Sequence, residues 1–454
     1  MTLPHDHRTA AAPRRQLTLM DCTSIIVGII IGAAIYEMSP AIAASVPNAA
    51  CLLGVWVLGG LLSLIGALCY AELASAYPQE GGDYVYLTRG LGRTLGFLFA
   101  WAQFWIVRPG SLGAMAYVFA DYANRLHPLG EGKLALVTYA VAAILVLSAV
   151  NILGVREGKW TQNLLTAVKV LGLIAVVVAG MCCAAPAAAA VTPMNDVKID
   201  FSKAMIFVLF AYGGWNEMAY VGAEVRRPEK NILRALLLGT LAVTLIYVLV
   251  TVAFLHALGM TGLRQATQVA AAVLERSLGP WGGRLISGLI CASALGAING
   301  MIFTGARIYY AMGTEHRLYR WLGRWSPRWQ TPARSLVIQA AVTLLLVVGF
   351  GLTASGFESM VKFTMPVFWI FFLLVGVSLL VLRRREPDRP RPFRVPCYPL
   401  LPLLFCLSSL FMLWSSVSFA YDQRSNEAWW SIGILLVGVV MAAVERRKEL
   451  EARS

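Results

Sequence analysis

The sequence predicts an all-α integral membrane protein with twelve transmembrane helices. Its 454 residues are 58% hydrophobic and only 14% charged, whereas a soluble domain has about 25% charged residues. Apolar stretches of roughly 18 residues or more recur along the chain, as a bilayer core about 30 Å thick requires. No soluble domain or low-complexity linker interrupts them, so we expect a single membrane domain over residues 1–454.

The apolar stretches and the basic residues together predict a topology. The expected spans lie near residues 17–45, 49–77, 94–122, 133–155, 160–184, 201–222, 235–258, 284–311, 335–354, 359–382, 398–420 and 428–444. Most Lys and Arg residues fall in the loops that are cytoplasmic if the N-terminus is cytoplasmic, which is the positive-inside bias. Both termini are therefore expected in the cytoplasm, and the net charge of +14 needs no nucleic-acid partner. No removable signal peptide is expected, and the Ala- and Arg-rich composition suggests a bacterial inner (plasma) membrane.

Several chemistries have no support in the sequence. The eight cysteines lie almost all in or beside apolar spans, so no disulfide framework is expected. The five histidines are scattered without metal-ligand spacing, and we expect no metal or cofactor. No P-loop motif is present, and no nucleophile–base–acid set appears in the spans. ATP-driven pumping and enzymatic activity are therefore disfavoured.

Two of the spans are interrupted. The first contains IIVGIIIGAAIYEMSPAIAA with Gly28, Gly32 and Pro40, and the sixth contains AYGGWNE with Gly213 and Gly214. Glycines at matching positions in two halves of a membrane protein indicate inverted repeats around a binding site. Alternatively, the glycines only allow close helix packing, but two matched breaks beside polar residues favour the site.

The breaks predict both the repeat boundaries and the chemistry of a ligand. The first repeat would cover 17–184, the second 201–382, and two further helices 398–444. Unwound backbone inside a membrane is tolerated only where it lines a cavity or meets a ligand. The N-termini of half-helices attract an anionic group, and freed carbonyl groups accept hydrogen bonds from an ammonium. Such a site suits a zwitterion.

Several motifs resemble a known family. They are GALCYAELASAYPQEGGDYVYL (66–87), WIVRPGS (105–111), AVNILGVREGKWTQNLLTAVKVLGL, FAYGGWN and RPFRVPCYPLLP. These segments resemble the amino acid–polyamine–organocation superfamily, closest to its L-type amino acid transporter branch, along nearly the whole chain. The resemblance implies the LeuT-type fold, with two five-helix inverted repeats whose helices 1 and 6 are broken, plus two extra helices.

The resemblance also implies a substrate site built from backbone groups. The Gly-Ser-Gly break of the family matches Gly32-Ala33-Ala34 here, where the amides around Ala33 and Ala34 would hold a substrate carboxylate. The carbonyl groups expected to hold its ammonium belong to Ile30, Phe210 and Gly213. The Phe210 ring would cap the site as an outer gate. The residues expected to shape the second break are Gly214, Trp215 and Asn216.

This sequence departs from the family pattern at the carboxylate clamp. Ala33 replaces a hydroxyl-bearing residue, which removes one donor. Ala34 replaces a glycine, and its methyl group restricts backbone angles and close approach. The clamp is therefore expected to differ from that of the family.

Lys169 lies ten residues into the fifth span, or about 15 Å along a helix. A charge at this depth indicates a function, whereas a lysine near the surface would snorkel. The position resembles a family lysine whose ammonium replaces the sodium ion of sodium-coupled relatives. Its expected neighbours are the backbone near Gly28 and the segment with Ser293. A lysine there would remove the need for sodium, or carry a proton if desolvation lowered its pKa.

Other ionisable residues carry more than one interpretation. Glu217 follows the second break directly, and Glu37 lies just past the first. Each would select a cationic or polar substrate side chain or take a proton, or would only favour the start of a half-helix. Glu72 and Arg108 are expected to be structural partners in ion pairs or hydrogen bonds. An inner-gate network is expected from Glu224, Arg226, Arg227 and Lys230, and Asn299 would bond across helices.

The leading hypothesis is a secondary amino acid transporter that works by alternating access, as a sodium-independent exchanger or a proton-linked symporter. The alternative on the same fold is a carrier of polyamines or other organic cations, which the two acidic residues favour. A sensor that binds without transporting is a third possibility. Animal relatives are linked to a heavy chain through a cysteine between spans three and four. The loop DYANRLHPLGEGK has no cysteine, so we expect no disulfide-linked partner.

Overall fold

The computed structural model describes residues 13–130, 132–183, 200–266, 268–279, 281–353, 356–422 and 426–451. Helices make up almost all of this part of the chain, which contains two isolated β-bridges but no strand. The predicted span ends at residues 184 and 354 lie outside the described residues, as does the Ala-rich run near 184–191. The all-α prediction is confirmed.

Each predicted span contains one helix or a series of helical segments. In chain order they are α1 (Leu19–Ile30), α2 (Ala34–Glu37), α3 (Ser39–Ala44), α4 (Ala49–Ala76), α6 (Arg93–Ala102), the π-helical η1 (Gln103–Val107), α7 (Arg108–Leu126), α8 (Lys133–Leu153), α9 (Val155–Cys182), α10 (Phe201–Ala211), the 3₁₀ helix η2 (Trp215–Tyr220), α11 (Pro228–Gln265), α13 (Trp281–Glu315), α14 (Ala333–Thr353), α15 (Gly356–Arg385), α16 (Leu400–Asp422) and α17 (Asn426–Glu451). Three short helices lie outside the predicted spans, namely α5 (Asp83–Leu91), α12 (Val269–Leu278) and η4 (Arg317–Tyr319), and η3 (Gly222–Glu224) begins at the last residue of the sixth.

Ten helical stretches of the described residues are long and apolar enough to cross a bilayer. Large apolar side chains on their outer faces are exposed, including Leu164 and Leu171 on α9 and Leu241 and Leu245 on α11. A lipid-facing surface explains such exposure, because hydrocarbon replaces water there. The chain is therefore an integral membrane protein.

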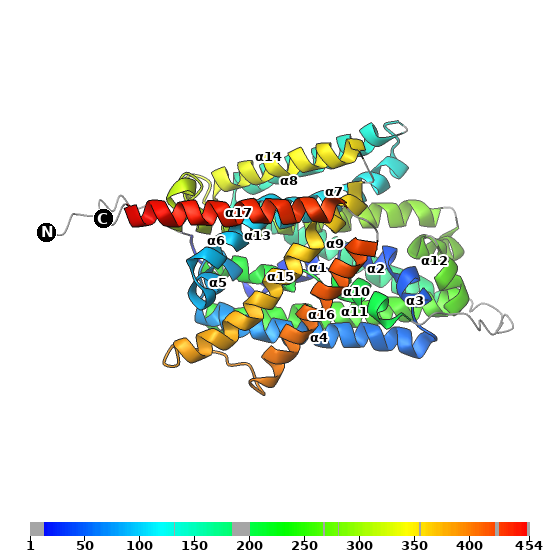
Figure 1. Cartoon of the computed structure of the whole chain (residues 1–454). Coiled ribbons are helices and arrows are strands. Elements are labelled where there is room, and N and C mark those ends of the chain that lie inside the picture. Colours follow the sequence, from blue (N-terminus) through cyan, green and yellow to red (C-terminus); the bar gives the residue numbers. More distant parts are fainter. Residues whose placement is uncertain are drawn as a thin grey trace.

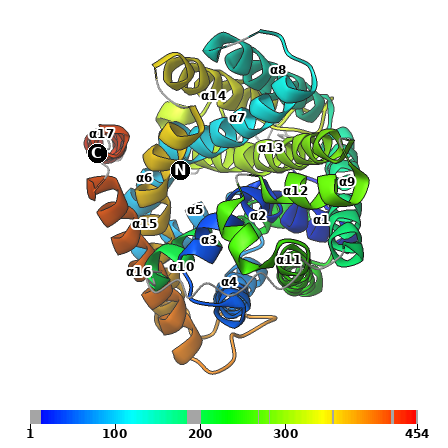
Figure 2. The same cartoon turned by 90° about the vertical axis from the view of Figure 1, so that its right-hand side faces the viewer.

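The first and sixth spans lie in the interior of the bundle (Figure 1). Viewed along the helices, α1 and α2 are surrounded by α4, α9, α11 and α13 (Figure 2). The broken elements also touch each other, because α1 packs against η2 and α10 against α2. This arrangement places both breaks side by side in the core.

Local sequence explains where the helices begin and end. Thr18 and Asp21 form a reciprocal capping box at the start of α1, which satisfies two free amide groups. Asn48 caps α4 through the Cys51 amide at 2.9 Å. Pro228 occupies the first turn of α11, where its missing N–H has no cost. We call the end of the bundle at which α1 begins and α17 finishes the termini end.

Candidate functional site

The break in the first span covers residues 31–33, between α1 and α2. Ala33 has φ −82° and ψ −13°, and Ala34 opens α2 with helical geometry. Neither residue has a conformation that requires glycine, so Ala34 causes no backbone strain here. Its effect on the close approach of a carboxylate stays a prediction. The missing Ala33 hydroxyl remains a difference, because the alanine side chain has no hydrogen-bond donor.

The break in the second span has a different geometry. After α10, the chain turns through Tyr212, Gly213 and Gly214 and continues as the 3₁₀ helix η2. Gly214 has φ +114°, and a Cβ atom there would lie 2.7 Å from the Cγ2 atom of Ile29. Glycine is therefore required, both for the backbone angle and for the close approach of the first break.

One side chain joins the two breaks. The Tyr247 hydroxyl on α11 lies 3.0 Å from the carbonyl oxygen of Ile30 and 3.0 Å from that of Ala211. Its ring packs against Trp56 and Tyr212 with centroids 5.2 Å away in both pairs. Tyr247 therefore fixes the ends of the two half-helices relative to each other.

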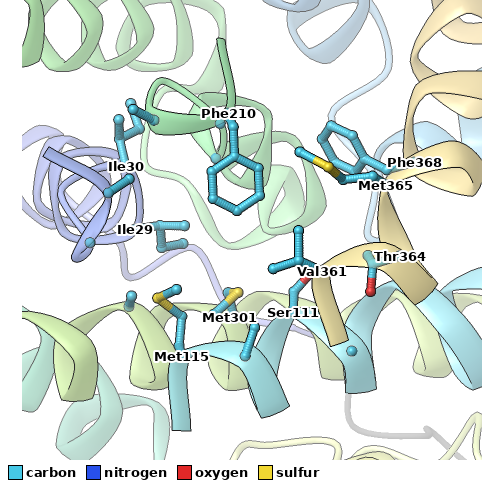
Figure 3. A pocket seen from close by; sticks show the side chains of 18 of the residues that line it. Ile29, Ile30, Ser111, Met115, Phe210, Met301, Val361, Thr364, Met365 and Phe368 are labelled. Carbon is cyan, nitrogen blue, oxygen red and sulfur yellow. The ribbon is translucent and has the colours of Figure 1, made fainter. Parts of the chain in front are cut away.

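A pocket of about 150 Å³ lies between the two breaks and the helices α7, α13 and α15. The Phe210 ring projects into it, and Met115 and Met301 lie on the other side (Figure 3). Other apolar lining residues include Met360, Val361, Met365 and Phe368, and the polar ones include Ser111, Thr364, Asn216 and Glu217. Engineered cavities of about this volume accept a benzene-sized group.

The predicted binding residues divide into those that line this pocket and those that do not. The lining set contains Ile30, Gly32, Ala33, Ala34, Phe210, Gly213, Gly214, Asn216 and Glu217. Trp215 is not among them: its ring lies 5.1 Å from Tyr70 and 5.5 Å from Phe372, centroid to centroid. Trp215 thus supports the break from the outside.

Glu217 is held by two neighbours at the floor of the pocket. The Arg108 Nη1 atom donates to both carboxylate oxygens at 3.0 Å, and the Thr304 hydroxyl donates to Oε2 at 2.5 Å. Arg108 is 2% exposed and Glu217 is 7% exposed. The negative charge of Glu217 is therefore balanced inside the protein. Arg108 forms an ion pair, as expected, although the sequence did not indicate its partner.

Lys169 is fully buried at the first break. Its Nζ atom lies 2.6 Å from the carbonyl oxygen of Gly28, 2.7 Å from that of Ile31 and 3.0 Å from that of Ser293. The three ammonium protons therefore each have a carbonyl acceptor, from α1, the break and α13. The Ser293 hydroxyl adds a bond to the Ile31 carbonyl at 2.9 Å.

Comparison with known proteins identifies the family of this chain. Residues 17–442 match the family described as amino acid permease. The chain belongs to the amino acid permease family. It is 30% identical over 410 residues to the serine/threonine exchanger SteT of Bacillus subtilis, covering 89% of this chain and 91% of the relative.

Two mammalian relatives are similar over almost the same region. The b(0,+)-type amino acid transporter 1 of Mus musculus is 29% identical over 413 residues, covering 88% of this chain and 82% of the relative. The large neutral amino acids transporter small subunit 2 of Homo sapiens is 30% identical over 422 residues, covering 89% and 77%. The family and these relatives are transporters, which supports the expectation that the permease is not an enzyme.

Glu37 lies apart from the permease pocket. Its side chain is exposed, and one carboxylate oxygen accepts a hydrogen bond from the Tyr122 hydroxyl on α7. It does not line the pocket. A direct contact of Glu37 with a ligand in that pocket is therefore not supported.

The expected inner-gate network is only partly present. Glu224 is fully buried and pairs with Arg307 of α13, Nε to Oε1, at 2.7 Å. Arg226, Arg227 and Lys230 are exposed, so they do not belong to this buried pair. Sequence reasoning missed Arg307, although an arginine within the span-eight helix was a visible signal.

Two further structural expectations agree with the contacts. Glu72 pairs with Arg383 at 2.5 Å and with Arg391 at 3.4 Å, so it is an ion-pair residue. Asn299 donates to Gln162 at 3.0 Å and to the Gly158 carbonyl at 3.1 Å, both on α9. Asn299 therefore bonds across helices. Tyr247 was missed, because nothing in the run TLIYVLV separates it from an ordinary apolar helix.

Proposed function

We propose that this permease is a secondary transporter for neutral amino acids that works by alternating access. It would act in a bacterial inner membrane with both termini in the cytoplasm, on two five-helix inverted repeats and two extra helices. The single observation that carries the choice of substrate is the Arg108–Glu217 pair. Because the guanidinium balances the only carboxylate that lines the pocket in the described residues, the pocket offers no net negative charge to a cationic side chain.

The rest of the pocket supports the same substrate class. Its walls are largely apolar, with methionine side chains from three helices, namely Met115, Met301, Met360 and Met365. Methionine is flexible and adapts to apolar groups of different shape. The names of two of these relatives refer to exchange of serine and threonine and to large neutral amino acids, which are all uncharged in their side chains. A polyamine carrier, the alternative on the same fold, fits this pocket less well.

The backbone groups at the breaks would bind the zwitterionic end of the substrate. We assign the carboxylate to the amides around Gly32, Ala33 and Ala34. The Gly213 carbonyl would accept from the ammonium, together with the carbonyls of Ile30 and Phe210. Ile30 already accepts from the Gly32 amide at 2.8 Å and from Tyr247, and Phe210 accepts from the Gly213 amide at 3.0 Å. A substrate ammonium could therefore bind the Ile30 and Phe210 carbonyls only if their present hydrogen bonds bent or broke.

Lys169 supports transport without sodium. A sodium ion at the first break would need oxygen ligands, and the Gly28, Ile31 and Ser293 carbonyls are taken by the ammonium of Lys169. We infer that the permease is a sodium-independent exchanger or a proton-linked symporter. Gly28 contributes its carbonyl group to Lys169. It also lets α1 and α9 pack closely, because a Cβ atom at Gly28 would lie 2.1 Å from the Nε2 atom of Gln162.

Uptake into proteoliposomes tests this function. Purified permease would be given radiolabelled L-leucine, L-methionine, L-serine, L-arginine or spermidine, with empty or amino-acid-loaded vesicles, with and without sodium and a pH gradient. We expect uptake of neutral amino acids that ignores sodium. Dependence on internal amino acid would identify an exchanger, and acceleration by a pH gradient in empty vesicles a symporter. Uptake of spermidine or arginine alone, or strict sodium dependence, would overturn the proposal.

A further inference from the structure

A group of charged residues is buried between the floor of the pocket and the termini end. It includes four carboxylates, from Glu80, Asp83, Glu217 and Glu224, and two guanidinium groups, from Arg108 and Arg307. Each guanidinium pairs with one carboxylate: Arg108 with Glu217 and Arg307 with Glu224. If all six groups were ionised, two negative charges would remain without a cation. Buried charges without a partner are so costly that the group takes a proton instead.

Asp83 is one of the two unbalanced carboxylates. It is 1% exposed at the start of α5, outside the membrane spans. Its Oδ2 atom accepts from the Tyr70 hydroxyl at 2.9 Å and from the Tyr220 hydroxyl at 2.8 Å. Its Oδ1 atom is buried and has no partner, so it has room for a proton. Burial raises the pKa of Asp83 to about 7, against the opposing effect of the two hydroxyl donors.

The charged groups that face Asp83 do not offset the effect of burial on its pKa. Glu217 raises its pKa further, whereas Arg108 lowers it, and these two side chains form an ion pair with each other. The remaining titratable neighbours are the hydroxyl groups of Tyr70, Tyr86 and Tyr220. None of them supplies a positive charge of its own.

Glu80 is the second unbalanced carboxylate, in the loop between α4 and α5. It is 8% exposed, and neither of its buried oxygens has a hydrogen-bond partner. Burial raises the pKa of Glu80 well above its ordinary value, and the charge of Glu224 adds to this effect while Arg307 opposes it. Tyr310 is its other titratable neighbour. Glu80 is therefore expected to be protonated in this conformation.

The backbone next to these carboxylates closes the termini end. The Gly81 amide donates to the Tyr220 carbonyl at 3.2 Å, and Glu80 forms an isolated bridge with Val221. The segment 220–226 is also bonded to Leu17. The Leu17 amide donates to the Glu224 carbonyl, and the Arg226 amide donates to the Leu17 carbonyl, both at 2.9 Å. Opening this end must separate the loop 77–82 from residues 220–225, which would bring water to both carboxylates.

We propose that Glu80 and Asp83 form a proton-binding site that holds the termini end closed while it is protonated. When this end opens, each carboxyl O–H bond breaks, the proton passes to water, and the carboxylate becomes hydrated. The proton site thus lies beside the gate, at a distance from Lys169 and Glu37. The inference rests on the proposed function only in treating the closure as a transport gate.

The direction of the pH effect follows from linkage. Both carboxyl groups have raised pKa values in the closed conformation, and hydrated ones titrate near about 4. The closed conformation therefore binds more protons between these values, and its stability relative to the open one is greatest at low pH. This stability is lost as the pH rises through the raised pKa values. Between the pKa values of the open and the closed conformation, the open–closed equilibrium shifts by about tenfold per pH unit for each proton.

Hydrogen–deuterium exchange of the full-length protein in lipid nanodiscs tests the site without any substrate. Peptides covering 77–87 and 217–226 report the bonds of the gate, after correction for the intrinsic pH dependence of amide exchange. Between about pH 6 and about pH 9, we expect their protection in the native protein to fall at least about tenfold. The double variant E80Q/D83N, whose amides are permanently neutral, should stay protected at the high pH.

Controls separate this site from a general effect of pH. E229Q removes an exposed carboxylate at the start of α11 and should behave as the native protein does. Peptides from α8 and α14 report whether a variant is folded, and the single variants E80Q and D83N should each retain part of the pH dependence. If the double variant is unfolded, the infrared C=O absorption of protonated carboxyl groups in native protein and single variants decides.

The outcomes are distinct from those of the transport assay. Three results would overturn the proton site. Protection of the gate peptides in the native protein would not depend on pH, or the double variant would show the same pH dependence as the native protein. The third result is an infrared spectrum in which neither E80Q nor D83N removes an absorption of protonated carboxyl groups. None of these results bears on which solute crosses the membrane. A negative uptake screen would overturn the proposed function and leave the proton site standing.

Discussion

The Arg108 Nη1 atom lies 3.0 Å from both carboxylate oxygens of Glu217, in the interior of the protein and at the floor of the pocket. Arg108 belongs to α7, directly after the π-helical turn η1, and π turns are often found at functional sites. Glu217 belongs to the half-helix after the second break. The pair therefore connects a continuous helix to a broken one.

The first prediction concerns the cost of leaving one member of this pair alone. R108M or E217L leaves a buried charge without its partner, which destabilises a protein by about 3–5 kcal/mol. The double variant R108M/E217L removes both charges and should be much closer to the native protein in thermal stability. Thermal unfolding of the four proteins in detergent forms a double-mutant cycle. A loss in the double variant equal to the sum of the two single losses would show that the pair is not coupled.

The second prediction concerns Lys169. K169A would leave the Gly28, Ile31 and Ser293 carbonyls without their shared donor, and an unsatisfied buried acceptor costs about 1–3 kcal/mol. We expect a lower unfolding temperature and loss of amino acid uptake. K203A, at an exposed lysine of α10, is the control and should be neutral in both measurements.

Sodium provides a sharper test of the same lysine. If the ammonium fills a cation position, sodium should raise the unfolding temperature of K169A relative to choline, and it should not affect the native protein. A native protein that sodium stabilises would contradict the role proposed for Lys169.

The third prediction concerns Gly214. G214A would need φ near +114° and would bring a methyl group against Ile29, at a cost of order 1–3 kcal/mol for the backbone strain alone. We expect loss of transport and reduced stability. G433A, on α17 where an added Cβ meets nothing within 4 Å, should be silent in unfolding and uptake measurements. Native-like uptake by G214A would mean that the second break does not need this geometry.

The sequence alone was sufficient for much of the fold. Apolar stretches predicted where the helices run, since hydrophobic length is a strong signal in membranes. It also indicated both breaks, because adjacent glycines such as Gly213 and Gly214 are unusual inside a span. The boundaries of long helices were less accurate at one end: α11 begins at Pro228, before the predicted span 235–258. A kink at Gly259, with φ +68°, separates the last turns up to Gln265 from the rest of the helix.

The candidate site was harder to predict where pairs of residues distant in sequence meet. The sequence left open whether Glu217 faces the ligand or only favours the start of a half-helix. Only the fold shows that Arg108, 109 positions earlier, neutralises it. Glu80 and Asp83 read as ordinary loop residues after a helix. Their burial without a cation depends on how η2 and η3 pack over the loop, which no local pattern reveals.

The last prediction concerns Tyr247, whose hydroxyl bonds both half-helix ends. Y247F keeps the ring packing against Trp56 but removes the donor that the Ile30 and Ala211 carbonyls share. The Ile30 carbonyl keeps the Gly32 amide, so the loss of stability should be small, about 1 kcal/mol. The two breaks would be held less firmly, and groups that bind a substrate must be placed closely to act together. We therefore expect a raised KM for uptake of the best neutral amino acid.

Y212F is the matched control, because the Tyr212 hydroxyl belongs to the same aromatic cluster but donates to the Trp56 carbonyl at 3.0 Å. If Y212F raised KM as much as Y247F, the effect would belong to the cluster and not to the bond between the breaks.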